Sequence, residues 1–407
     1  MKRRAFLQSS VAIAASAALP VLSGAEESTP EQTKTVDKPL VKSYRPLGKT
    51  DLRISDISFG AGKLPSASMV LRAIDQGMNY FDTAPDYGNS ETLIGEAMTR
   101  FKQRDKIYIA SKYCSPQPYP GHLPLGTTKA DYIAAVEASL KRMNLDYLDV
   151  VFVHAIGEKS TNVEEEQKRL LDDAMLAATE ELKKAGKVRH LAVSSHGPNN
   201  LEPLLTTAVT SGHFDWIMTA FNFMKFPKLP DVLQLAAQHG VGVIAMKTLA
   251  GAKESGVEAG GVPFEHAAFR WVLKHPQVAG LVVTIKTVED LNHYLQASGT
   301  PFTAQDQRAL DRYAALYGQT YCRTGCGDCM GACPQGVDIA NILRYQMYFA
   351  DYGDEKRAMQ SYASLTRSAA SCLACQEPTC TAACAHGLPV ANKLQAAHRT
   401  LSFAPIA

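Results

Sequence analysis

The stretch that decides the fold runs from Phe81 to Glu91 and reads Phe-Asp-Thr-Ala-Pro-Asp-Tyr-Gly-Asn-Ser-Glu. Apolar residues at its start predict a short strand, Pro85 and Gly88 end that strand, and Ser90 begins a helix. An aspartate and a tyrosine therefore lie directly after a strand. In a barrel of alternating strands and helices, the loops after the strands form the catalytic face. From these residues alone, a capped turn with a buried aspartate is the alternative.

Apolar runs recur along the chain with helical stretches between them, which predicts an α/β fold with parallel strands. The helical stretches carry apolar faces suited to packing on a sheet. The expected strands are Ile54–Gly60, Asn79–Asp82, Ile107–Lys112, Asp149–His154, His190–Ser194, Trp216–Phe221, Val241–Lys247 and Gly280–Ile285.

Two further polar residues close strands. Lys112 ends the third expected strand and His154 ends the fourth, so both side chains should lie at the carboxyl-end face of the sheet. Taken singly, such a lysine is more often a surface residue, and such a histidine is more often a core residue with its hydrogen bonds satisfied.

The segment from Phe81 to Glu91 resembles the FDTA..YG.SE signature of the aldo-keto reductases. Tyr44–Thr50 resembles the amino-terminal hairpin of that family, and Ile54–Gly62 resembles its first barrel strand. The resemblance extends from about Tyr44 to about Ala297. It implies a (β/α)8 TIM barrel, and the resemblance, rather than periodicity, sets the number of strands at eight.

The resemblance also implies that Asp82, Tyr87, Lys112 and His154 are the catalytic residues. When hydride reduces a carbonyl, the resulting alkoxide needs a proton, which Tyr87 is placed to give. Lys112, held by Asp82, is expected to lower the pKa of the tyrosine. His154 is expected to polarise the carbonyl as a neutral hydrogen-bond donor. In the oxidative direction, Tyr87 and Lys112 would take the proton away.

The nicotinamide-binding positions of the family are only partly retained. A Ser-Asn pair is usual after the fifth strand, whereas this chain has Ser194 and Ser195, and Met218 stands where a glutamine is usual. Lys286 and Thr287 are the expected phosphate-binding residues at a helix start. No arginine stands where the family holds a 2′-phosphate. The expected cofactor is therefore NADP or NAD, with weak or absent nucleotide exchange as an alternative.

Eight of the nine cysteines lie between Cys322 and Cys384, which marks a second module. They form two sets close to the bacterial ferredoxin pattern, in which a fourth cysteine reaches across to the other cluster. This pattern predicts two [4Fe-4S] clusters in a mainly helical, ferredoxin-like domain. Because the spacings are not standard, two zinc sites or a disulfide framework are alternatives. The expected ligands are Cys322, Cys326, Cys329 and Cys384 for one cluster, and Cys372, Cys375, Cys380 and Cys333 for the other.

Two more segments, His196-Gly197 and Ala245–Gly251, resemble members of the family that carry iron–sulfur domains. The ninth cysteine, Cys114, is expected to be a small packing residue. Helices are expected at residues 306–316, 339–349, 356–365 and 390–401.

The amino terminus indicates export. Lys2-Arg3-Arg4-Ala5-Phe6-Leu7 precedes a short apolar run and resembles a twin-arginine signal that is cleaved near Ala25. The run is too short for a comfortable transmembrane helix. An ordinary basic helix start and an uncleaved membrane anchor are the alternatives. Because the twin-arginine route exports folded proteins with cofactors inserted, a periplasmic location is predicted.

These observations predict an exported oxidoreductase that interconverts a carbonyl and an alcohol by nicotinamide hydride transfer, with an iron–sulfur electron-transfer module. A barrel with weak or lost nicotinamide exchange, acting as an electron-relay or binding subunit, is the alternative. The substrate is expected to be a small carbonyl or alcohol compound such as a sugar, and a redox partner protein is a further expectation. The net charge of +2 gives no reason to expect nucleic acid. The expected domains are the signal at 1–25, a linker at 26–43, the barrel at 44–300 and a two-cluster domain at 301–407.

Overall fold

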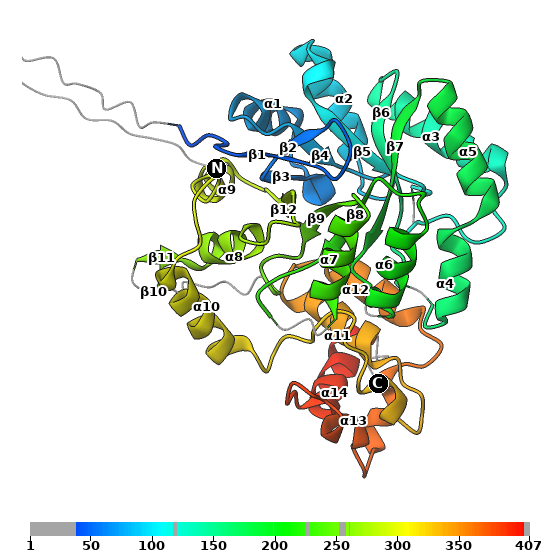
Figure 1. Ribbon diagram of the computed structural model, residues 1–407. Coiled ribbons are helices and arrows are strands. Elements are labelled where there is room, and N and C mark those ends of the chain that lie inside the picture. Colours follow the sequence, from blue (N-terminus) through cyan, green and yellow to red (C-terminus); the bar gives the residue numbers. More distant parts are fainter. Residues whose placement is uncertain are drawn as a thin grey trace, which may run out of the picture. The chain divides into compact units, whose positions relative to one another are not determined.

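A closed barrel of parallel strands forms the centre of the structure (Figure 1). The structure is a computed structural model that describes residues 38–116, 120–158, 160–197, 199–224, 228–251, 258–259 and 261–402. The barrel strands are β3 (Ile57–Gly60), β4 (Tyr80–Asp82), β5 (Tyr108–Lys112), β6 (Leu148–Val153), β7 (Val188–Ser195), β8 (Trp216–Ala220), β9 (Gly242–Met246) and β12 (Gly280–Thr284).

Each barrel strand pairs with its neighbours in chain order, and β12 closes the ring by pairing with both β9 and β3. All eight expected strands are present, so the predicted (β/α)8 barrel is confirmed. The strands are apolar runs because helices cover the outer face of the sheet and side chains fill its interior. Every residue of β6, for example, is buried.

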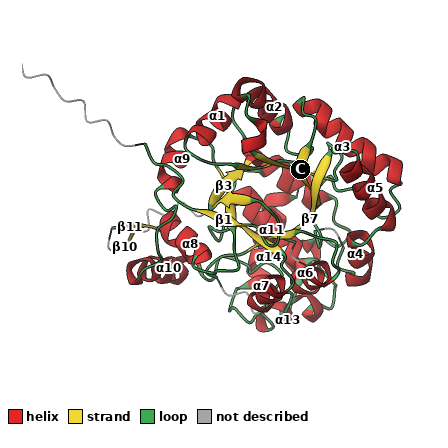
Figure 2. Cartoon of the chain, turned by 45° about the horizontal axis from the view of Figure 1, so that its top comes forward, coloured by secondary structure: helices red, strands yellow, loops and turns green. Residues whose placement is uncertain are grey.

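Helices surround the ring of strands (Figure 2). Their apolar faces and the outer faces of the strands form one continuous hydrophobic core. In chain order these helices are α1 (Ala67–Asp75), α2 (Ser90–Phe101), α3 (Lys129–Met143), α4 (Val163–Leu170), α5 (Asp173–Lys184), α6 (Leu201–Thr210), α7 (Leu229–Gln238), α8 (Phe264–Leu273) and α9 (Val288–Leu295).

A hairpin of β1 (Tyr44–Pro46) and β2 (Arg53–Ser55) precedes the barrel, as the resemblance implies. Leu47, Leu52 and Ile54 pack with the side chains that fill the barrel interior. The first barrel strand was expected to begin at Ile54, but this residue belongs to the hairpin. Asp56 separates β2 from β3 and belongs to neither strand. Its carboxylate accepts hydrogen bonds from Ser298 Oγ at 2.6 Å and from the Gly299 amide at 2.8 Å.

The carboxyl-terminal region is mainly helical, as expected, and residues 322–402 contain no strand. This region has its own hydrophobic core, in which four helices pack around the cysteines. They are α11 (Ile339–Ala350), α12 (Glu355–Ala363), α13 (Thr379–Ala382) and α14 (Val390–Leu401), with 3₁₀ turns at Met330–Ala332 and Ala369–Ala374.

The boundary between the two cores lies later than residue 300. Helix α10 (Ala304–Tyr317) follows the expected boundary, yet its inward residues Ala309, Leu310 and Tyr313 belong to the core of the barrel. Beside α10 lies the small hairpin of β10 (Glu258–Ala259) and β11 (Val262–Pro263). The barrel core also includes Tyr321, so the cysteine-rich region begins at about Cys322.

Several expectations fall outside the described residues. The export signal at 1–25 does so entirely, as does the linker up to residue 37. The rest of the linker packs on the barrel, since the Val41 amide donates to the Gln76 carbonyl at 2.8 Å. The loops expected to line the mouth of the barrel, 116–126 and 251–261, are described only in part. Among the described helices, none is long and apolar enough to cross a bilayer.

Candidate active site

Asp82, Tyr87, Lys112 and His154 lie together at the carboxyl end of the barrel. Asp82 ends β4, Lys112 ends β5 and His154 follows β6. The Lys112 ammonium donates to Asp82 Oδ1 at 2.6 Å and to the Thr83 carbonyl oxygen at 2.7 Å. It also lies 5.0 Å from the centre of the Tyr87 ring. The rings of Tyr87 and His154 meet edge to face with their centres 6.1 Å apart. The four side chains therefore form one constellation.

The protonation states of this group favour giving a proton over taking one. Burial raises the pKa of Tyr87 well above its ordinary 10.0, and Asp82 raises it further. The expected lowering of this pKa by Lys112 stays a prediction, and the ammonium that would produce it is paired with Asp82. Burial, followed by the charge of Lys112, lowers the pKa of His154 well below 6.5. The imidazole is therefore neutral, as expected.

The other residues of the signature hold the constellation in place. Thr83 Oγ1 and Ser90 Oγ are hydrogen-bonded at 2.7 Å, which ties the end of β4 to the start of α2. Glu91 is 1% exposed and accepts a hydrogen bond from Ser111 Oγ of β5 at 2.6 Å. Arg142 of α3 neutralises this buried carboxylate. The Ser-Glu part of the signature is thus structural, since it ties α2 to the end of β4, to β5 and to α3.

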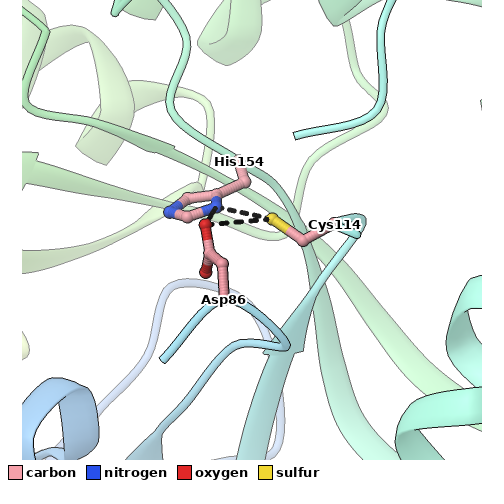
Figure 3. A group of neighbouring side chains, drawn as sticks. All are labelled: Asp86, Cys114 and His154. Carbon is pink, nitrogen blue, oxygen red and sulfur yellow. Dashed lines mark hydrogen bonds and ion pairs between the residues drawn. The ribbon is translucent and has the colours of Figure 1, made fainter. Parts of the chain in front are cut away.

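A second layer beside His154 was not foreseen. Cys114 Sγ lies 2.8 Å from His154 Nδ1, and Asp86 Oδ2 lies 3.7 Å from the same nitrogen (Figure 3). All three side chains are buried. Cys114, expected only to fill space, is buried as expected but also touches the site. Its position two residues after Lys112 was the sequence feature that could have indicated a place beside the site.

Ser194 and Ser195 end β7 and are buried. Ser195 Oγ donates to the Ile156 carbonyl oxygen at 2.8 Å, and Ser194 Oγ accepts from the Ala155 amide at 3.4 Å. Both hydroxyls are thus engaged with the loop after β6. Met218 of β8 belongs to the apolar filling of the barrel interior. It offers no amide to a nicotinamide carboxamide.

The turn before α9 binds a side chain of the chain itself where a phosphate was expected. Asp290 Oδ2 accepts from the amides of Lys286 at 3.0 Å and Thr287 at 3.1 Å, and Thr287 Oγ1 accepts from the Asp290 amide at 3.0 Å. This capping box satisfies the amides of Thr287 and Asp290. A phosphate that bound the amides of Lys286 and Thr287 would compete with the like-charged carboxylate of Asp290.

The cysteines of the carboxyl-terminal region fall into the two predicted sets. Four of them line a single cavity, namely Cys322, Cys326, Cys329 and Cys384. In the other set, burial raises the pKa of Cys372 to about 11, and three neighbouring thiols raise it further, namely those of Cys333, Cys380 and Cys375.

The spacing of these thiols distinguishes between the expected kinds of site. None of the nine cysteines is in a disulfide. A tetrahedral zinc ion with Zn–S bonds of about 2.3 Å holds its sulfurs about 3.8 Å apart. Within the described part of the chain, the one group of three or more potential ligand atoms within 4.8 Å of one another is that of Asp86, Cys114 and His154. No three thiols of either cysteine set lie within 4.8 Å of one another. Cubane ligands bind four different irons and stand further apart.

Arg344 of α11 joins the cysteine-rich region to the barrel. Its guanidinium contacts His196 Nδ1 at 2.6 Å, Thr324 Oγ1 at 3.1 Å and Glu158 Oε1 at 3.5 Å. Glu158 and His196 also contact each other. Glu158 follows β6 and His196 follows β7, so α11 lies against the carboxyl ends of these strands. All four side chains are buried, which makes this a buried ion-pair network.

Lys247 makes a second contact between the two regions. It follows β9, and its ammonium lies 5.2 Å from the centre of the Tyr348 ring and 4.8 Å from that of Tyr352. Lys63, which follows β3, donates to the Tyr352 carbonyl oxygen at 2.8 Å. The two segments that resemble iron–sulfur members of the family, at His196 and at Lys247, thus both contact the cysteine-rich region.

Comparison with known proteins identifies the barrel. A sequence profile described as "Aldo/keto reductase family" matches residues 62–257. A 7-acetyl-epi-neemfruitin B aldo-keto reductase from Melia azedarach is 34% identical over 43% of this chain and 55% of its own length. A 6-dehydroglucose reductase from Novosphingobium aromaticivorans is 27% identical over 61% of this chain and 87% of its own length. This chain thus spans about half of the first relative and most of the second.

A crystal structure of a putative aldo-keto reductase from Pseudomonas aeruginosa agrees in fold and sequence. Its TM-score is 0.51 at 26% identity, over 68% of this chain and 98% of that one. The profile match ends before the cysteine-rich region, so it concerns the barrel. Together with the constellation at the barrel mouth, these matches show that residues 62–257 are similar to the aldo/keto reductase family, whose named relatives here are reductases.

Proposed function

We propose that the protein reduces a small carbonyl compound to the alcohol at Asp82, Tyr87, Lys112 and His154. The observation that carries the proposal is the buried Lys112, which bonds Asp82 at 2.6 Å and lies 5.0 Å from the Tyr87 ring. The high pKa of Tyr87 keeps its phenol protonated, which suits a proton donor better than a base.

Each residue of the chain has a task in this reaction. His154, neutral and buried, donates a hydrogen bond to the carbonyl oxygen and makes the carbon more electrophilic. NAD(P), which aldo-keto reductases use, supplies hydride when bound. The oxygen gains negative charge as the carbon is reduced, and the Tyr87 hydroxyl gives it a proton. Lys112 keeps positive charge beside the phenolate that forms, and Asp82 holds Lys112 in place.

A sugar is the substrate class that we favour. The 6-dehydroglucose reductase relative is named for a sugar derivative and aligns over most of its length. The proposal is tested by incubating the cluster-loaded protein with a reductant and a panel of aldoses, ketoses and simple aldehydes, and then identifying the alcohol by mass spectrometry. Turnover of no carbonyl compound by the wild type, under conditions where its clusters can be reduced, would contradict the proposal.

A second candidate concerns the source of electrons. The capping carboxylate of Asp290 holds the amides of Lys286 and Thr287, and Arg344 and Tyr348 of α11 lie against the strand ends near Ser194. Both features oppose exchange with free nucleotide. In this second candidate, the barrel exchanges little or no free nicotinamide, and the protein relays electrons between the cysteine-rich region and a redox partner protein.

Anaerobic titration with NADPH and then NADH separates the two candidates. Nucleotide fluorescence and the visible absorbance of the clusters are followed together. If the Asp290 cap excludes phosphate, neither nucleotide binds at submillimolar concentration, while dithionite still reduces the clusters. Tight binding of either nucleotide would reject the second candidate, and bleaching of the clusters by the bound nucleotide would show that barrel and module exchange electrons.

We also propose that the two cysteine sets hold two [4Fe-4S] clusters. Support comes from the common cavity of the first set, the proximity of the thiols in the second, and the absence of zinc spacing or disulfides among these described cysteines. Cys322, Cys326, Cys329 and Cys384 would hold one cluster, and Cys333, Cys372, Cys375 and Cys380 the other. Such clusters supply one-electron transfer when bound.

Serine variants test how the cysteines are grouped. Cys384→Ser and Cys329→Ser are expected to lose the same cluster, whereas Cys333→Ser and Cys380→Ser lose the other, about four irons in each case. Iron content and electron paramagnetic resonance of the reduced protein distinguish the two centres. Cys114→Ser is the matched control and should keep both. Loss of the same centre in Cys384→Ser and Cys333→Ser would refute the grouping.

We propose a periplasmic location, reached by the twin-arginine route. The paired arginines before a short apolar run support it, and a cofactor-bearing protein suits a route that exports folded chains. Cell fractionation of the wild type and of a variant with Arg3 and Arg4 replaced by lysine tests it. A wild-type protein that remains in the cytoplasm would contradict it.

A further inference from the structure

Cys114 and Asp86 lie beside His154, and the tasks assigned above use neither. Cys114 follows β5 and Asp86 lies in the loop after β4. Their side chains converge on one nitrogen of the imidazole, and the other ring nitrogen points away from them (Figure 3). The distances are 2.8 Å from Nδ1 to Cys114 Sγ, 3.7 Å from Nδ1 to Asp86 Oδ2, and 3.8 Å from Sγ to Oδ2.

This arrangement matters because a neutral imidazole carries one proton. The nitrogen that bears the proton is a donor and the other nitrogen is an acceptor. His154 polarises a carbonyl only if the nitrogen remote from Cys114, Nε2, carries the proton. The group that faces Nδ1 therefore decides whether His154 is a donor or an acceptor toward the substrate.

Two groups compete for Nδ1. A carboxylate only accepts hydrogen bonds, so Asp86 would draw the proton to Nδ1 and leave Nε2 bare. The Asp86 oxygen nearest the ring already accepts the Gly121 amide at 2.9 Å and stands 3.7 Å from Nδ1, beyond hydrogen-bond distance. Cys114 is nearer by 0.9 Å (3.7 less 2.8) and carries a proton of its own. The thiol also lies within 3.8 Å of Asp86 Oδ2 as a donor, but Nδ1 is nearer at 2.8 Å. If the thiol directs its hydrogen at Nδ1, that nitrogen is an acceptor.

We infer that Cys114 is a positioning residue whose thiol donates a hydrogen bond to His154 Nδ1, keeps Asp86 from that nitrogen, and so holds the imidazole proton on Nε2. This inference rests on the proposed function, in which His154 donates to the carbonyl oxygen. Burial and the charge of Asp86 raise the pKa of Cys114 well above its ordinary 9.0, which keeps the thiol protonated.

A divalent metal is the other chemistry that these three atoms suggest. The 2.8 Å between Sγ and Nδ1 is a direct contact, shorter than the separation of about 3.5 Å between sulfur and nitrogen ligands of one zinc ion. The positive charges of Lys112 and Arg169 act on His154 and lower its pKa, and the same charges would oppose a dication. The hydrogen bond is therefore the better account.

Nitrogen NMR of the oxidised, cluster-loaded protein labelled with ¹⁵N-histidine measures the tautomer directly. The His154 signals are identified by their loss in His154→Gln. We expect the proton on Nε2 in the wild type and in Cys114→Ser, which keeps a donor. In Cys114→Ala we expect it on Nδ1, where the Asp86 carboxylate can accept it.

The same variants predict a kinetic pattern. Cys114→Ala should lower kcat by about 10- to 100-fold with little change in KM, because the lost interaction acts on the transition state. Cys114→Ser should restore most of kcat, and adding Asp86→Asn to Cys114→Ala should restore part of it. Ser115→Ala, which removes a neighbouring hydroxyl that donates to the Gly121 carbonyl oxygen, is the matched control.

The outcomes separate this inference from the proposed function. A wild-type protein with the proton on Nδ1, or a Cys114→Ala protein with the wild-type tautomer, overturns the role of Cys114, and neither measurement needs turnover. Failure of the wild type to reduce any carbonyl overturns the proposed function and leaves the tautomer result standing. If Cys114→Ala does not fold, Cys114→Val, which also removes the donor, gives the same test.

Discussion

Replacing Tyr87 with phenylalanine is expected to lower kcat for carbonyl reduction by about 10²- to 10⁴-fold, with little change in KM. The change removes one hydroxyl and leaves the ring that lies beside Lys112 and His154. Substrate binding should therefore persist while proton transfer to the oxygen is lost. Steady-state kinetics with the best carbonyl substrate measure both parameters.

Tyr113→Phe is the matched control for this variant. Tyr113 is buried directly after Lys112, and its hydroxyl is hydrogen-bonded to Thr179 Oγ1 at 2.8 Å, away from the site. Because burial raises the pKa of Tyr87 well above 10.0, its ionisation should not reduce the wild-type rate between about pH 6 and pH 9. Equal kcat in Tyr87→Phe and Tyr113→Phe would remove Tyr87 from the mechanism.

The barrel was predictable because its signals are local. Parallel strands covered by helices are apolar runs, and all eight were found within a few residues of their observed bounds. The predicted helix at 390–401 has the bounds of α14. The start of the first barrel strand was predicted too early, because Ile54 continues the apolar run. The separation of the two strands lies at Asp56, whose carboxylate binds Ser298 and Gly299. These partners are more than 240 residues away in the chain, so no local sequence pattern indicates the contact.

The site was predictable where it follows strand ends. Asp82, Lys112 and His154 end or follow neighbouring strands, so the topology of a parallel barrel brings them together. Their catalytic roles stay a prediction. The raised pKa of Tyr87 was not foreseen, because its largest cause is burial, and the extent of burial cannot be read from the sequence.

Contacts between the barrel and the cysteine-rich region could not be predicted from the sequence. The network joins residues that are far apart in the chain, because Glu158 and His196 follow barrel strands and Arg344 lies on α11. Nothing in the sequence near Arg344 distinguishes it from a surface arginine. The sequence did contain one sign, the resemblance of the His196 and Lys247 segments to iron–sulfur members of the family. Both segments contact α11 or the residues that follow it. The resemblance thus reflects an interface.

The Arg344 network predicts the second large effect. Arg344→Met should destabilise the attachment of the cysteine-rich region by about 3–5 kcal/mol, because it leaves the Glu158 carboxylate buried without the guanidinium. Both tryptophans, Trp216 and Trp271, lie in the barrel, so their fluorescence reports the barrel alone, while cluster absorbance reports the other core. We expect the two denaturation curves to coincide in the wild type and to separate in Arg344→Met.

Two comparisons make this prediction specific to the network. Arg308→Met makes the same chemical change on the exposed face of α10 and should shift either curve by no more than about 0.5 kcal/mol. Glu158→Gln combined with Arg344→Met should recover part of the loss, because no uncompensated carboxylate is then buried. Equal shifts in Arg344→Met and Arg308→Met would mean that the network contributes nothing to the attachment.

Acid should weaken the same attachment in the wild type. Burial lowers the pKa of His196 from 6.5 to about 4, against the opposing effect of Glu158. The folded protein therefore keeps this imidazole neutral at pH values where the unfolded chain has already bound a proton. Its stabilising contribution is complete above pH 6.5 and is lost as the pH falls toward 4. As the pH falls through this range, the denaturation curve measured by cluster absorbance should move to lower denaturant concentration before the curve measured by tryptophan fluorescence does. The reason is that the network lies at the boundary between the two cores.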